Sequence, residues 1–490
     1  MRARIASASA AALAVVTIVA LGTPNVVAHA GTAAPSSKVR YALNQIGPQN
    51  GGGEPSEAIA ADHTIYVSAP GDAMEFWRSM DAGRTWAQGS SPESPSGDTS
   101  VNVDASGAVY ETNLNVITGD QNTLQVDLFK SFDRGATWPQ KGTSAIEDSN
   151  ASGQPALVDR QWTDAWIPPN HTTDTATVCM TYHDFGPSQM WVSCSFDGGR
   201  TFDLPVDAIS SPLAQADSYC NTIPGGLKIV PSGTHAGRIY LAWLAADPAN
   251  PVSGCNLTQL AAFHSIWSAF SDDGGATWTD QLVYDAGPLH DGSEIFADLT
   301  LDNHGNPYVG FVMNIASEYD IWVEASFNGG LTWNGKTDGT GTPYRVNGDN
   351  GTHFFAAIAA GNPGQVDVAY LDTPTLVGSL ATGKPNEPSG DANADWNVFV
   401  GQSTNLLTGA PTFTNTRMTP VPMHHGDICT LGLFCSAVPG TNRNLLDFID
   451  IQVDASGFFH IAYTDDHNYS NGALVMANQT GGTKVGAGGH

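Results

Sequence analysis

Short apolar segments alternate with polar and glycine-rich turns along most of the chain, and the segments come in pairs. Three clear copies read VNVDASGAVYETN (101–113), LTLDNHGNPYVGFV (299–312) and IQVDASGFFHIAYTDD (451–466). In each copy an apolar strand precedes a turn, and a second strand with an aromatic residue follows it. Looser copies lie at 58–69, 165–184, 227–243 and 357–372. Because no long segment follows the 3.6-residue period of a helix, the pattern predicts an all-β protein with seven strand pairs.

A second repeat, which we call the repeat turn, follows five of these pairs. Its pattern is Ser-x-Asp-x-Gly-x-Thr-Trp with small variations, at 79–86, 131–138, 195–202, 271–278 and 326–333; a degenerate sixth copy runs from Ser403 to Phe413. Asp accepts backbone hydrogen bonds in a tight turn, and Gly takes a positive φ there. We therefore interpret the third residue of each copy as a structural turn residue: Asp81, Asp133, Asp197, Asp273 and Asn328.

The strands on either side of each repeat turn complete a four-stranded antiparallel sheet, which is the blade of a β-propeller. Seven strand pairs favour seven blades, and a six-bladed ring is the alternative. The last blade has only ALVMANQ after its strand pair, so VRYALNQI (39–46) is expected to supply its missing strand. We predict a single propeller domain over 38–480, a loose segment at 31–37 and a flexible glycine-rich tail at 481–490.

The first thirty residues have the features of a secretory signal peptide. Arg2 and Arg4 are followed by an apolar run from Ala10 to Leu21, and Ala28-His29-Ala30 offers small residues at a cleavage position. We expect cleavage after Ala30 and a secreted protein without stable membrane insertion. A retained anchor is the alternative, although the apolar run is short for a span of about 20 residues.

The net charge of -29 narrows the range of partners. Loss of Arg2 and Arg4 makes the charge -31 (-29 minus 2). So acidic a surface repels phosphate backbones and anionic membranes, and the sequence therefore predicts no nucleic-acid partner. The acidity serves solubility. We expect a monomer with no required cofactor, while bound calcium stays an open alternative.

Six cysteines in an exported chain indicate disulfides rather than a metal site, because no C-x-x-C pair is present. Cys179 and Cys194 lie symmetrically about a turn, so a hairpin places them opposite each other. Cys429 and Cys435 can close a small loop, which leaves Cys220 to pair with Cys255. His424 and His425 could hold a metal, but solvated histidines on a disulfide-bonded loop are the commoner outcome.

Candidate site residues follow from the topology of a blade. Its first strand begins, and its second strand ends, at the same face, whereas the repeat turns lie at the opposite face. Polar residues of many blades therefore converge on one rim, at the central mouth, where propellers bind ligands. The first strands begin near Glu57 (or Glu54), Asp98, Asp159-Arg160, Asn221, Glu294, His353 and Asp447.

We selected catalytic and binding candidates from this rim. The catalytic candidates are Asp159, Glu294, Asp298 and Asp447, and the ligand-binding candidates are Arg160, Arg443, Glu57, Asp184, His353 and Asp450. Arg160 and Arg443 each accompany a carboxylate and could grip a ligand carboxylate or hydroxyl. The alternatives are solvated strand ends and a fixed Arg–Asp pair between blades.

The repeat turns resemble the Asp-box, or BNR repeat, and over residues 40–480 the chain resembles the sialidase (neuraminidase) superfamily. The stretch from His353 to Asp466 resembles uncharacterised exported bacterial proteins of this kind. The resemblance implies three arginines on a substrate carboxylate, a Tyr nucleophile with a Glu partner, and an Asp acid/base. The Arg-Ile-Pro motif of sialidases is absent, and PSEAIAA (55–61) stands at the first inner strand.

Three functions compete on this basis. The first is a secreted propeller that binds a glycan or protein ligand at its central mouth. The second is a secreted glycoside hydrolase, similar to an exo-sialidase, that uses paired rim carboxylates as acid and base. The third is a protease-resistant scaffold. No complete catalytic set is visible in the sequence, so the binding function is our first hypothesis.

Overall fold

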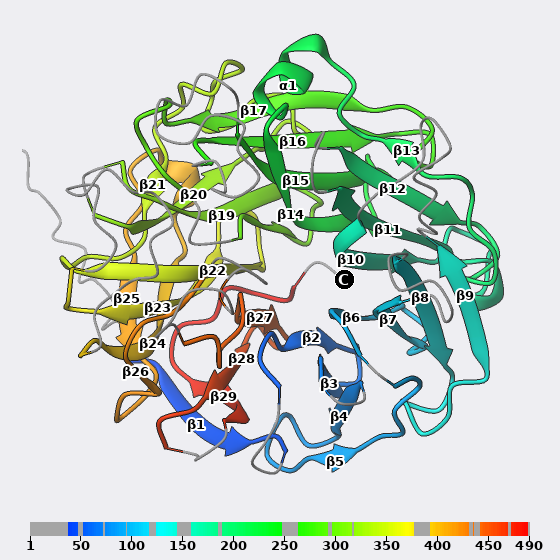
Figure 1. The fold of residues 1–490 in the computed structure, drawn as a ribbon, viewed down its shortest axis with the longest axis horizontal. Coiled ribbons are helices and arrows are strands. Elements are labelled where there is room, and N and C mark those ends of the chain that lie inside the picture. Colours follow the sequence, from blue (N-terminus) through cyan, green and yellow to red (C-terminus); the bar gives the residue numbers. More distant parts are fainter. Residues whose placement is uncertain are drawn as a thin grey trace, which may run out of the picture. The chain divides into compact units, whose positions relative to one another are not determined.

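The computed structural model shows an all-β protein in which seven antiparallel sheets are arranged around a common centre (Figure 1). Residues of all seven innermost strands line a central channel. It describes residues 38–488, apart from 48–51, 72–73, 95, 117–123, 145–157, 185–188, 247–262, 293–295, 316–317, 377–392, 431–434, 436–441 and 469–471. The predicted propeller is confirmed with seven blades, and the six-bladed alternative is wrong. The predicted signal peptide and the segment 31–37 lie outside the described residues.

The first four blades follow one another along the chain, each with its innermost strand first. Blade 1 is β2 (Ser56–Ile59), β3 (Ile65–Ala69), β4 (Glu75–Ser79) and β5 (Ala87–Gln88); blade 2 is β6 (Thr99–Val103), β7 (Val109–Val116), β8 (Leu124–Ser131) and β9 (Gln140–Ser144); blade 3 is β10 (Val158–Trp166), β11 (Thr177–Asp184), β12 (Met190–Ser195) and β13 (Val206–Asp207); blade 4 is β14 (Asn221–Ile229), β15 (Ile239–Ala246), β16 (Ser265–Ser271) and β17 (Thr279–Asp285).

The last three blades complete the ring. Blade 5 is β18 (Asp298–Leu301), β19 (Pro307–Met313), β20 (Asp320–Ala325) and β21 (Tyr344–Arg345); blade 6 is β22 (Thr352–Ala360), β23 (Val366–Thr373), β24 (Asp395–Ser403) and β25 (Thr414–Arg417), with β26 (His424–His425) also on β24; blade 7 is β27 (Asp450–Val453), β28 (Phe459–Asp465), β29 (Ala473–Gly481) and β1 (Arg40–Gln45). The helical elements described are α1 (Pro212–Asp217) and two 3-10 turns, Thr173–Thr175 and Leu406–Thr408. No described helix is long and apolar enough to span a bilayer.

The N-terminal strand closes the ring, as the sequence predicts. β1 pairs antiparallel with β29, from Tyr41 opposite Gln479 to Gln45 opposite Val475. The blade that ends the chain thus takes its outermost strand from the beginning of the domain. This pairing joins the two ends of the propeller and so closes the ring.

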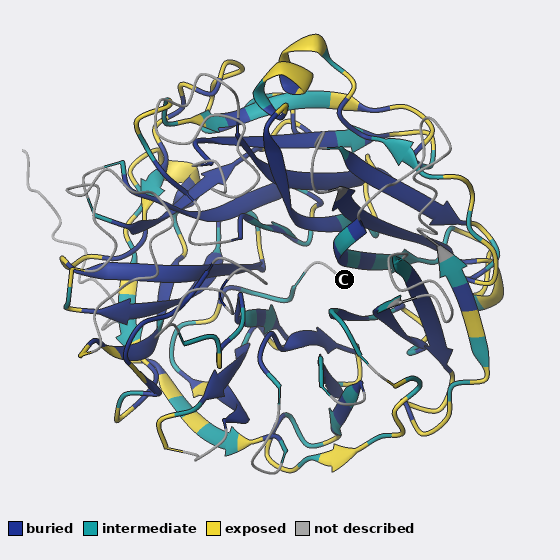
Figure 2. Cartoon of the chain, in the orientation of Figure 1, coloured by how far each residue is buried: buried dark blue, intermediate teal, exposed yellow. Residues whose placement is uncertain are grey.

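The apolar core lies between neighbouring blades rather than at one centre (Figure 2). One buried cluster joins blades 3 and 4 through Val192, Leu241 and Trp243, and another joins blades 4 and 5 through Tyr240 and Phe311. The second strand of each blade also contributes one fully buried tyrosine: Tyr66, Tyr110, Tyr182, Tyr240, Tyr308, Tyr370 and Tyr463. The aromatic residue of each predicted strand pair therefore serves packing between blades.

Each repeat turn folds around its third residue. In blade 1, Asp81 accepts hydrogen bonds from Thr85 N (2.8 Å) and Thr85 Oγ1 (2.7 Å), while Ser79 Oγ accepts one from Gly83 N (2.8 Å). Asp133, Asp197, Asp273 and Asn328 accept the same threonine amide in their own turns. The fifth-position glycines have φ values between 74° and 90°. The pairing of Ile65 with Ser79 places the blade 1 turn beside the β2–β3 hairpin, away from the start of the inner strand.

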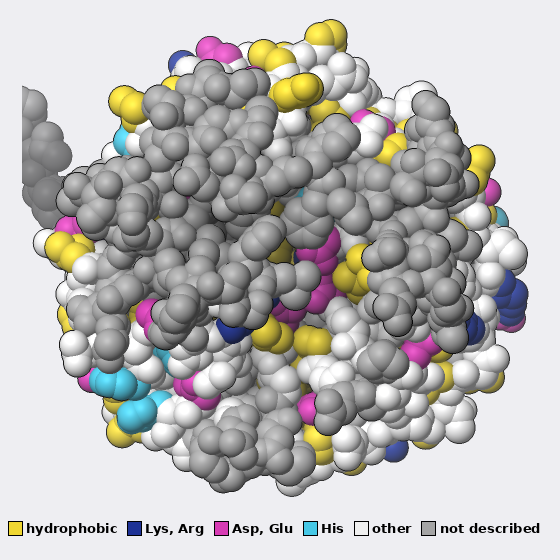
Figure 3. Space-filling view, viewed as in Figure 1, with side chains coloured by type: hydrophobic (Ala, Val, Ile, Leu, Met, Phe, Trp, Pro, Cys, Tyr) yellow, Lys and Arg dark blue, Asp and Glu magenta, His cyan; other side chains and the backbone are white. Residues whose placement is uncertain are grey.

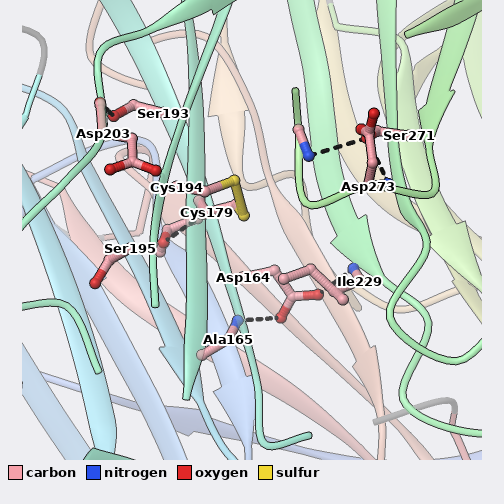
Figure 4. The surroundings of a disulfide bond; sticks show 12 residues. Asp164, Ala165, Cys179, Ser193, Cys194, Ser195, Asp203, Ile229, Ser271 and Asp273 are labelled. Atoms are coloured by element: carbon pink, nitrogen blue, oxygen red, sulfur yellow. Dashed lines mark hydrogen bonds between the residues drawn. A yellow bond between two sulfur atoms is a disulfide. The ribbon is translucent and has the colours of Figure 1, made fainter. Parts of the chain in front are cut away.

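Two predicted disulfides are confirmed. Cys179 and Cys194 face each other across β11 and β12, with Cα atoms 4.1 Å apart (Figure 4). Cys429 and Cys435 close their small loop, with Cα atoms 6.0 Å apart. Cys220 is also disulfide-bonded, and its predicted partner Cys255 lies outside the described residues.

Candidate functional site

The central mouth is the end of the channel at which the inner strands begin. Three inner strands are interrupted near this end by a β-bulge: β10 between Asp159 and Trp162, β14 between Pro224 and Leu227, and β22 between Phe354 and Ala357. Inside the first bulge, Arg160 has a φ of +40°. Bulges and a left-handed φ at a non-glycine residue concentrate at functional sites.

Four carboxyl groups from four consecutive blades converge at the mouth. Glu54 precedes β2, Asp98 precedes β6, Asp159 lies on β10, and Asp447 precedes β27. Asp98 and Asp159 share a side-chain hydrogen bond, as do Glu54 and Asp447. Acidic side chains are visible at the centre of this face in Figure 3. We call these four residues, together with Arg160 and Arg443, the mouth cluster.

Burial and neighbouring negative charges raise the pKa values of Asp159 and Glu54. Burial, and then the charge of Asp98, raise the pKa of Asp159 to about 8. Burial, and then the charges of Asp98 and Asp447, raise the pKa of Glu54 well above its usual range. Carboxylates in hydrogen-bond contact cannot all be ionised in a buried setting. The Asp159 carboxyl is therefore largely protonated near neutral pH, while Asp447 is held by Arg443 in an ion pair.

The two arginines play different parts in the mouth cluster. Arg443 forms a two-pronged ion pair with Asp447, in which Nη2 lies 2.5 Å from Oδ2, and the same nitrogen lies 3.9 Å from Glu54. Arg160 donates from Nη1 to the carbonyl of Thr99 (3.0 Å). Its Nε and Nη2 have no hydrogen-bond partner among the described residues, although the residue is only 4% exposed. Arg160 thus keeps unused donors beside the carboxyls.

Three aromatic side chains form a cluster against the guanidinium of Arg160. The rings of Trp162, Phe296 and Phe448 lie 5.2 to 6.4 Å apart, centre to centre. The Arg160 guanidinium stacks on two of them, at 4.1 Å from Trp162 and 4.5 Å from Phe448. Stacking on two rings fixes the plane of the guanidinium.

These aromatic residues also line a cavity of about 340 Å³ in the channel, which the glycine-rich C-terminal segment reaches through Gly488. Residues 481–490 were expected to be a flexible tail. The structure differs, because Val485 is fully buried and its carbonyl accepts a hydrogen bond from Asn362 N (2.7 Å) in blade 6. Packing of Val485 against blade 6, which composition does not reveal, fixes the position of the described part of this segment, residues 481–488.

The channel wall holds a second set of carboxyls, which join blades. Asp164, Asp298 and Asp450 each accept a backbone N–H of the next blade: Ile229 (2.6 Å), Ile358 (2.8 Å) and Glu57 (2.7 Å). Burial, and then the charge of Asp450, raise the pKa of Asp298 to about 7. The Glu57 carboxyl is buried without a hydrogen-bond partner among the described residues. Asp164, Asp298 and Asp450 therefore link the inner strands of neighbouring blades by hydrogen bonds.

The structure separates the predicted site residues into groups. It brings Asp159, Arg160, Arg443 and Asp447 together in the mouth cluster and places Asp298, Asp450 and Glu57 in the channel wall. Glu294 lies outside the described residues, and the backbone of Asp184 ends β11 while its side chain is not described. His353 lies at the start of β22 beside Asp349 and Asp372.

Glu54 and Asp98 are the members of the mouth cluster that sequence reasoning did not select. Asp98 stands directly before β6 and Glu54 stands two residues before the start of β2, and this position was the available signal. A polar residue at a strand end is usually just solvated, so this signal alone could not distinguish them. Only their burial against Asp447 and Asp159 reveals their place.

The structure also describes the histidine pair, the arginines and the tyrosines that the sequence analysis considered. His424 was expected to be solvated, but it is 1% exposed and bonds to Asp466 (2.7 Å), whereas His425 is half-exposed beside Asp395. Among the described residues, the mouth cluster contains two arginines rather than the three of the sialidase pattern. The second-strand tyrosines Tyr182, Tyr370 and Tyr463 are buried between blades.

The fold and the mouth cluster define a seven-bladed propeller with an acidic central site. No protein-family model matches the chain. It is similar in fold to an ulvan lyase, a polysaccharide lyase solved with -[GlcA(1-4)Rha3S]-, at a TM-score of 0.50 and 10% identity over 91% of this chain and 97% of that one. It is also similar to an α-L-arabinofuranosidase from Fusarium graminearum (TM-score 0.42, 12% identity, 79% and 98% covered). An intramolecular trans-sialidase from Ruminococcus gnavus gives a TM-score of 0.41 at 12% identity, with 91% and 97% covered. At such identities the likeness concerns the fold alone.

Proposed function

We propose that this chain is a secreted propeller that binds a neutral glycan at its central mouth. The observation that carries the proposal is the mouth cluster itself, in which unused guanidinium donors of Arg160 stand beside four carboxyls from four blades. A binding site that offers hydrogen-bond donors beside hydrogen-bond acceptors suits a ligand rich in hydroxyl groups, because a hydroxyl group both donates and accepts hydrogen bonds.

The charge of the cluster favours neutral sugars over acidic ones. Four carboxyls face two guanidiniums, and Asp447 already engages Arg443 through both of its oxygens. An anionic sugar would find Arg160 as the one guanidinium of the cluster that is not already paired with a carboxylate, and its charge would be repelled by whichever carboxyls of the cluster are ionised. Sugar hydroxyls, by contrast, can donate to carboxylates and accept from Arg160 without such repulsion.

The two confirmed disulfides support the proposal that the chain works outside the cytoplasm. Disulfides form and persist mainly in oxidising compartments. The proposed export depends on the signal sequence over residues 1–30, and expression of the complete chain with analysis of its mature N-terminus tests it.

Binding can be tested with an array of neutral and sialylated oligosaccharides, followed by calorimetric titration of the best-bound glycan. We expect neutral glycans to bind, and we expect Asp447→Asn and Asp159→Asn each to weaken the affinity at least tenfold, about 1.4 kcal/mol. Arg200→Gln is the matched control, because Arg200 belongs to a repeat turn at the opposite end of its blade.

Two outcomes would overturn the binding proposal. One is a preference for sialylated glycans, and the other is equal affinity in the control and both mouth variants. Thermal unfolding of each variant shows whether a loss of affinity comes from a loss of folded protein.

A second function, hydrolysis of a glycosidic bond, is favoured by one specific observation. With a pKa of about 8, Asp159 remains protonated near neutral pH, which is the state that a general acid requires, and the same cluster holds Asp447, which forms an ion pair with Arg443. An acid with a raised pKa beside a carboxylate is the arrangement that glycoside hydrolases use. Turnover of chromogenic glycosides distinguishes the two functions, because a purely binding site gives none.

A further inference from the structure

A second group of converging side chains lies on blade 6, outside the mouth cluster. His353 stands near the start of β22 and pairs in register with Asp372 on β23, and Asp349 lies in the loop just before β22. One nitrogen of His353 and one oxygen of each aspartate lie within 4.8 Å of one another. His353 and Asp372 are buried, whereas the Asp349 side chain is 56% exposed.

The hydrogen bond at Nδ1 of His353 determines whether Nε2 offers a lone pair or a proton to the two aspartates. Nδ1 lies 2.9 Å from the carbonyl oxygen of Tyr319, which can only accept, so Nδ1 carries a proton. In the neutral ring, Nε2 then offers a lone pair toward Asp372 Oδ2 at 3.1 Å and Asp349 Oδ1 at 3.4 Å. Nε2 makes no hydrogen bond of acceptable geometry with either oxygen, although His353 has no exposed surface.

Three electron-rich atoms that face one another at a partly buried place attract a cation between them. We propose that Asp349, His353 and Asp372 bind a divalent transition-metal ion of the zinc class. Metal-ligating histidines typically donate their other ring N–H to a backbone carbonyl, as His353 does to Tyr319. Imidazole with two carboxylates is a donor set that suits zinc and not calcium, which takes oxygen ligands.

The spacing fits a tetrahedral site. Zinc bonds of about 2.0–2.2 Å separate neighbouring ligand atoms by roughly 3.3–3.6 Å in a tetrahedron, and the two N···O distances here are 3.1 and 3.4 Å. The exposure of Asp349 gives the ion a route from solvent. Asp320, on the Nδ1 side of the ring, is held by Arg345 (2.7 Å) and Asn347 (2.9 Å), so its charge is compensated locally.

A proton on Nε2 is the competing cation. Burial alone would lower the pKa of His353, but Asp349 and Asp372 raise it to about 9. An imidazolium held by two carboxylates and a metal held by all three groups are distinguishable, because only the metal site binds zinc with defined stoichiometry.

The test is a calorimetric titration of ZnCl₂ into chelator-treated, full-length protein, with CoCl₂ absorption spectra as a second readout. We expect one zinc ion per chain and a visible cobalt spectrum of a tetrahedral site. His353→Gln and Asp372→Asn should weaken zinc binding at least tenfold and remove that spectrum. Asp349→Asn, at the exposed side, should fold normally and weaken binding in the same direction, even if the two buried variants fail to fold.

His425→Gln is the matched control, because His425 is a half-exposed histidine of the same blade whose Nδ1 lies 2.8 Å from the carboxylate of Asp395. It should bind zinc as the unaltered protein does. The proposal is overturned if the unaltered protein binds no stoichiometric zinc, if Asp349→Asn binds zinc as tightly as the unaltered protein, or if calcium binds at these residues and zinc does not.

Discussion

At the scale of single residues, the position of a carboxyl group decides its chemistry. Asp159 and Asp298 both lie on inner strands, and the sequence predicts a catalytic role for both. Asp298 accepts the amide of Ile358 and so holds two blades together. Asp159 instead shares a hydrogen bond with another carboxyl at the mouth, and its pKa rises to about 8. The Asp298 carboxyl is thus engaged in joining two blades, whereas the Asp159 carboxyl faces other ionisable groups of the mouth cluster.

If the mouth hydrolyses glycosides, Asp159 is the proton donor, and its proton is lost as the pH rises through about 8. We therefore expect kcat/KM to fall above about pH 8, and Asp159→Asn to lower it by roughly 10²–10⁴-fold at every pH. Rates on chromogenic glycosides across this range provide the measurement. Asp164→Asn, a channel-wall substitution, is the control and should keep both the rate and its pH dependence.

At the scale of elements, the repeat turn is a local unit that repeats the same bonds in successive blades. Asp273 accepts hydrogen bonds from Thr277 N (2.9 Å), Thr277 Oγ1 (2.6 Å) and Ser271 Oγ (2.8 Å). In blade 5 the same place holds Asn328, whose side-chain oxygen accepts the equivalent amide at 3.0 Å. The turn thus needs an acceptor at this place more than it needs a charge.

We therefore predict that Asp273→Asn changes the free energy of unfolding by less than about 0.5 kcal/mol, whereas Asp273→Ala lowers it by about 1 kcal/mol or more. The alanine variant leaves Thr277 N without its partner. Urea denaturation of both variants measures the difference. Equal losses would mean that the charge, and not the acceptor, stabilises the turn.

The same contrast shows what the sequence could predict. Strand pairs, repeat turns, the closing strand at 39–46 and the Cys179–Cys194 hairpin are visible because each depends on residues close in sequence or on a repeated spacing. The pairing of Glu54 with Asp447 spans almost the whole chain, and the burial of Val485 depends on Asn362 in another blade. Such contacts form only when the ring closes, so no local pattern predicts them.

At the scale of the whole molecule, buried carboxyls dominate the response to pH. Burial raises the pKa of Asp207 to about 6, of Asp367 to about 7 and of Glu324 to about 9. These groups hold their protons more tightly in the folded chain than in the unfolded chain. The stability that they contribute is therefore complete below their unfolded pKa, about 4, and is lost as the pH rises through the folded values.

Another set of carboxyls acts in the opposite direction at low pH. Burial opposes the effect, but hydrogen bonds lower the pKa of Asp197 and Asp454 to about 2. Their contribution is present above the unfolded pKa and is lost as the pH falls below about 4. We therefore expect the unfolding temperature to be highest between about pH 4 and pH 6 and to decrease toward pH 8 and above. Thermal scans in buffers of constant ionic strength test this, and a maximum at pH 8 or above would contradict it.

The central claim is that the ligand site lies where the four carboxyls and Arg160 meet. A crystal structure of the chain with its best-bound oligosaccharide tests it most directly. We predict a sugar ring at the mouth, with its oxygens in hydrogen-bond contact with Arg160 and with at least one of Asp159 and Asp447. A sugar bound among the repeat turns or on an outer strand, with the mouth empty, would contradict the account.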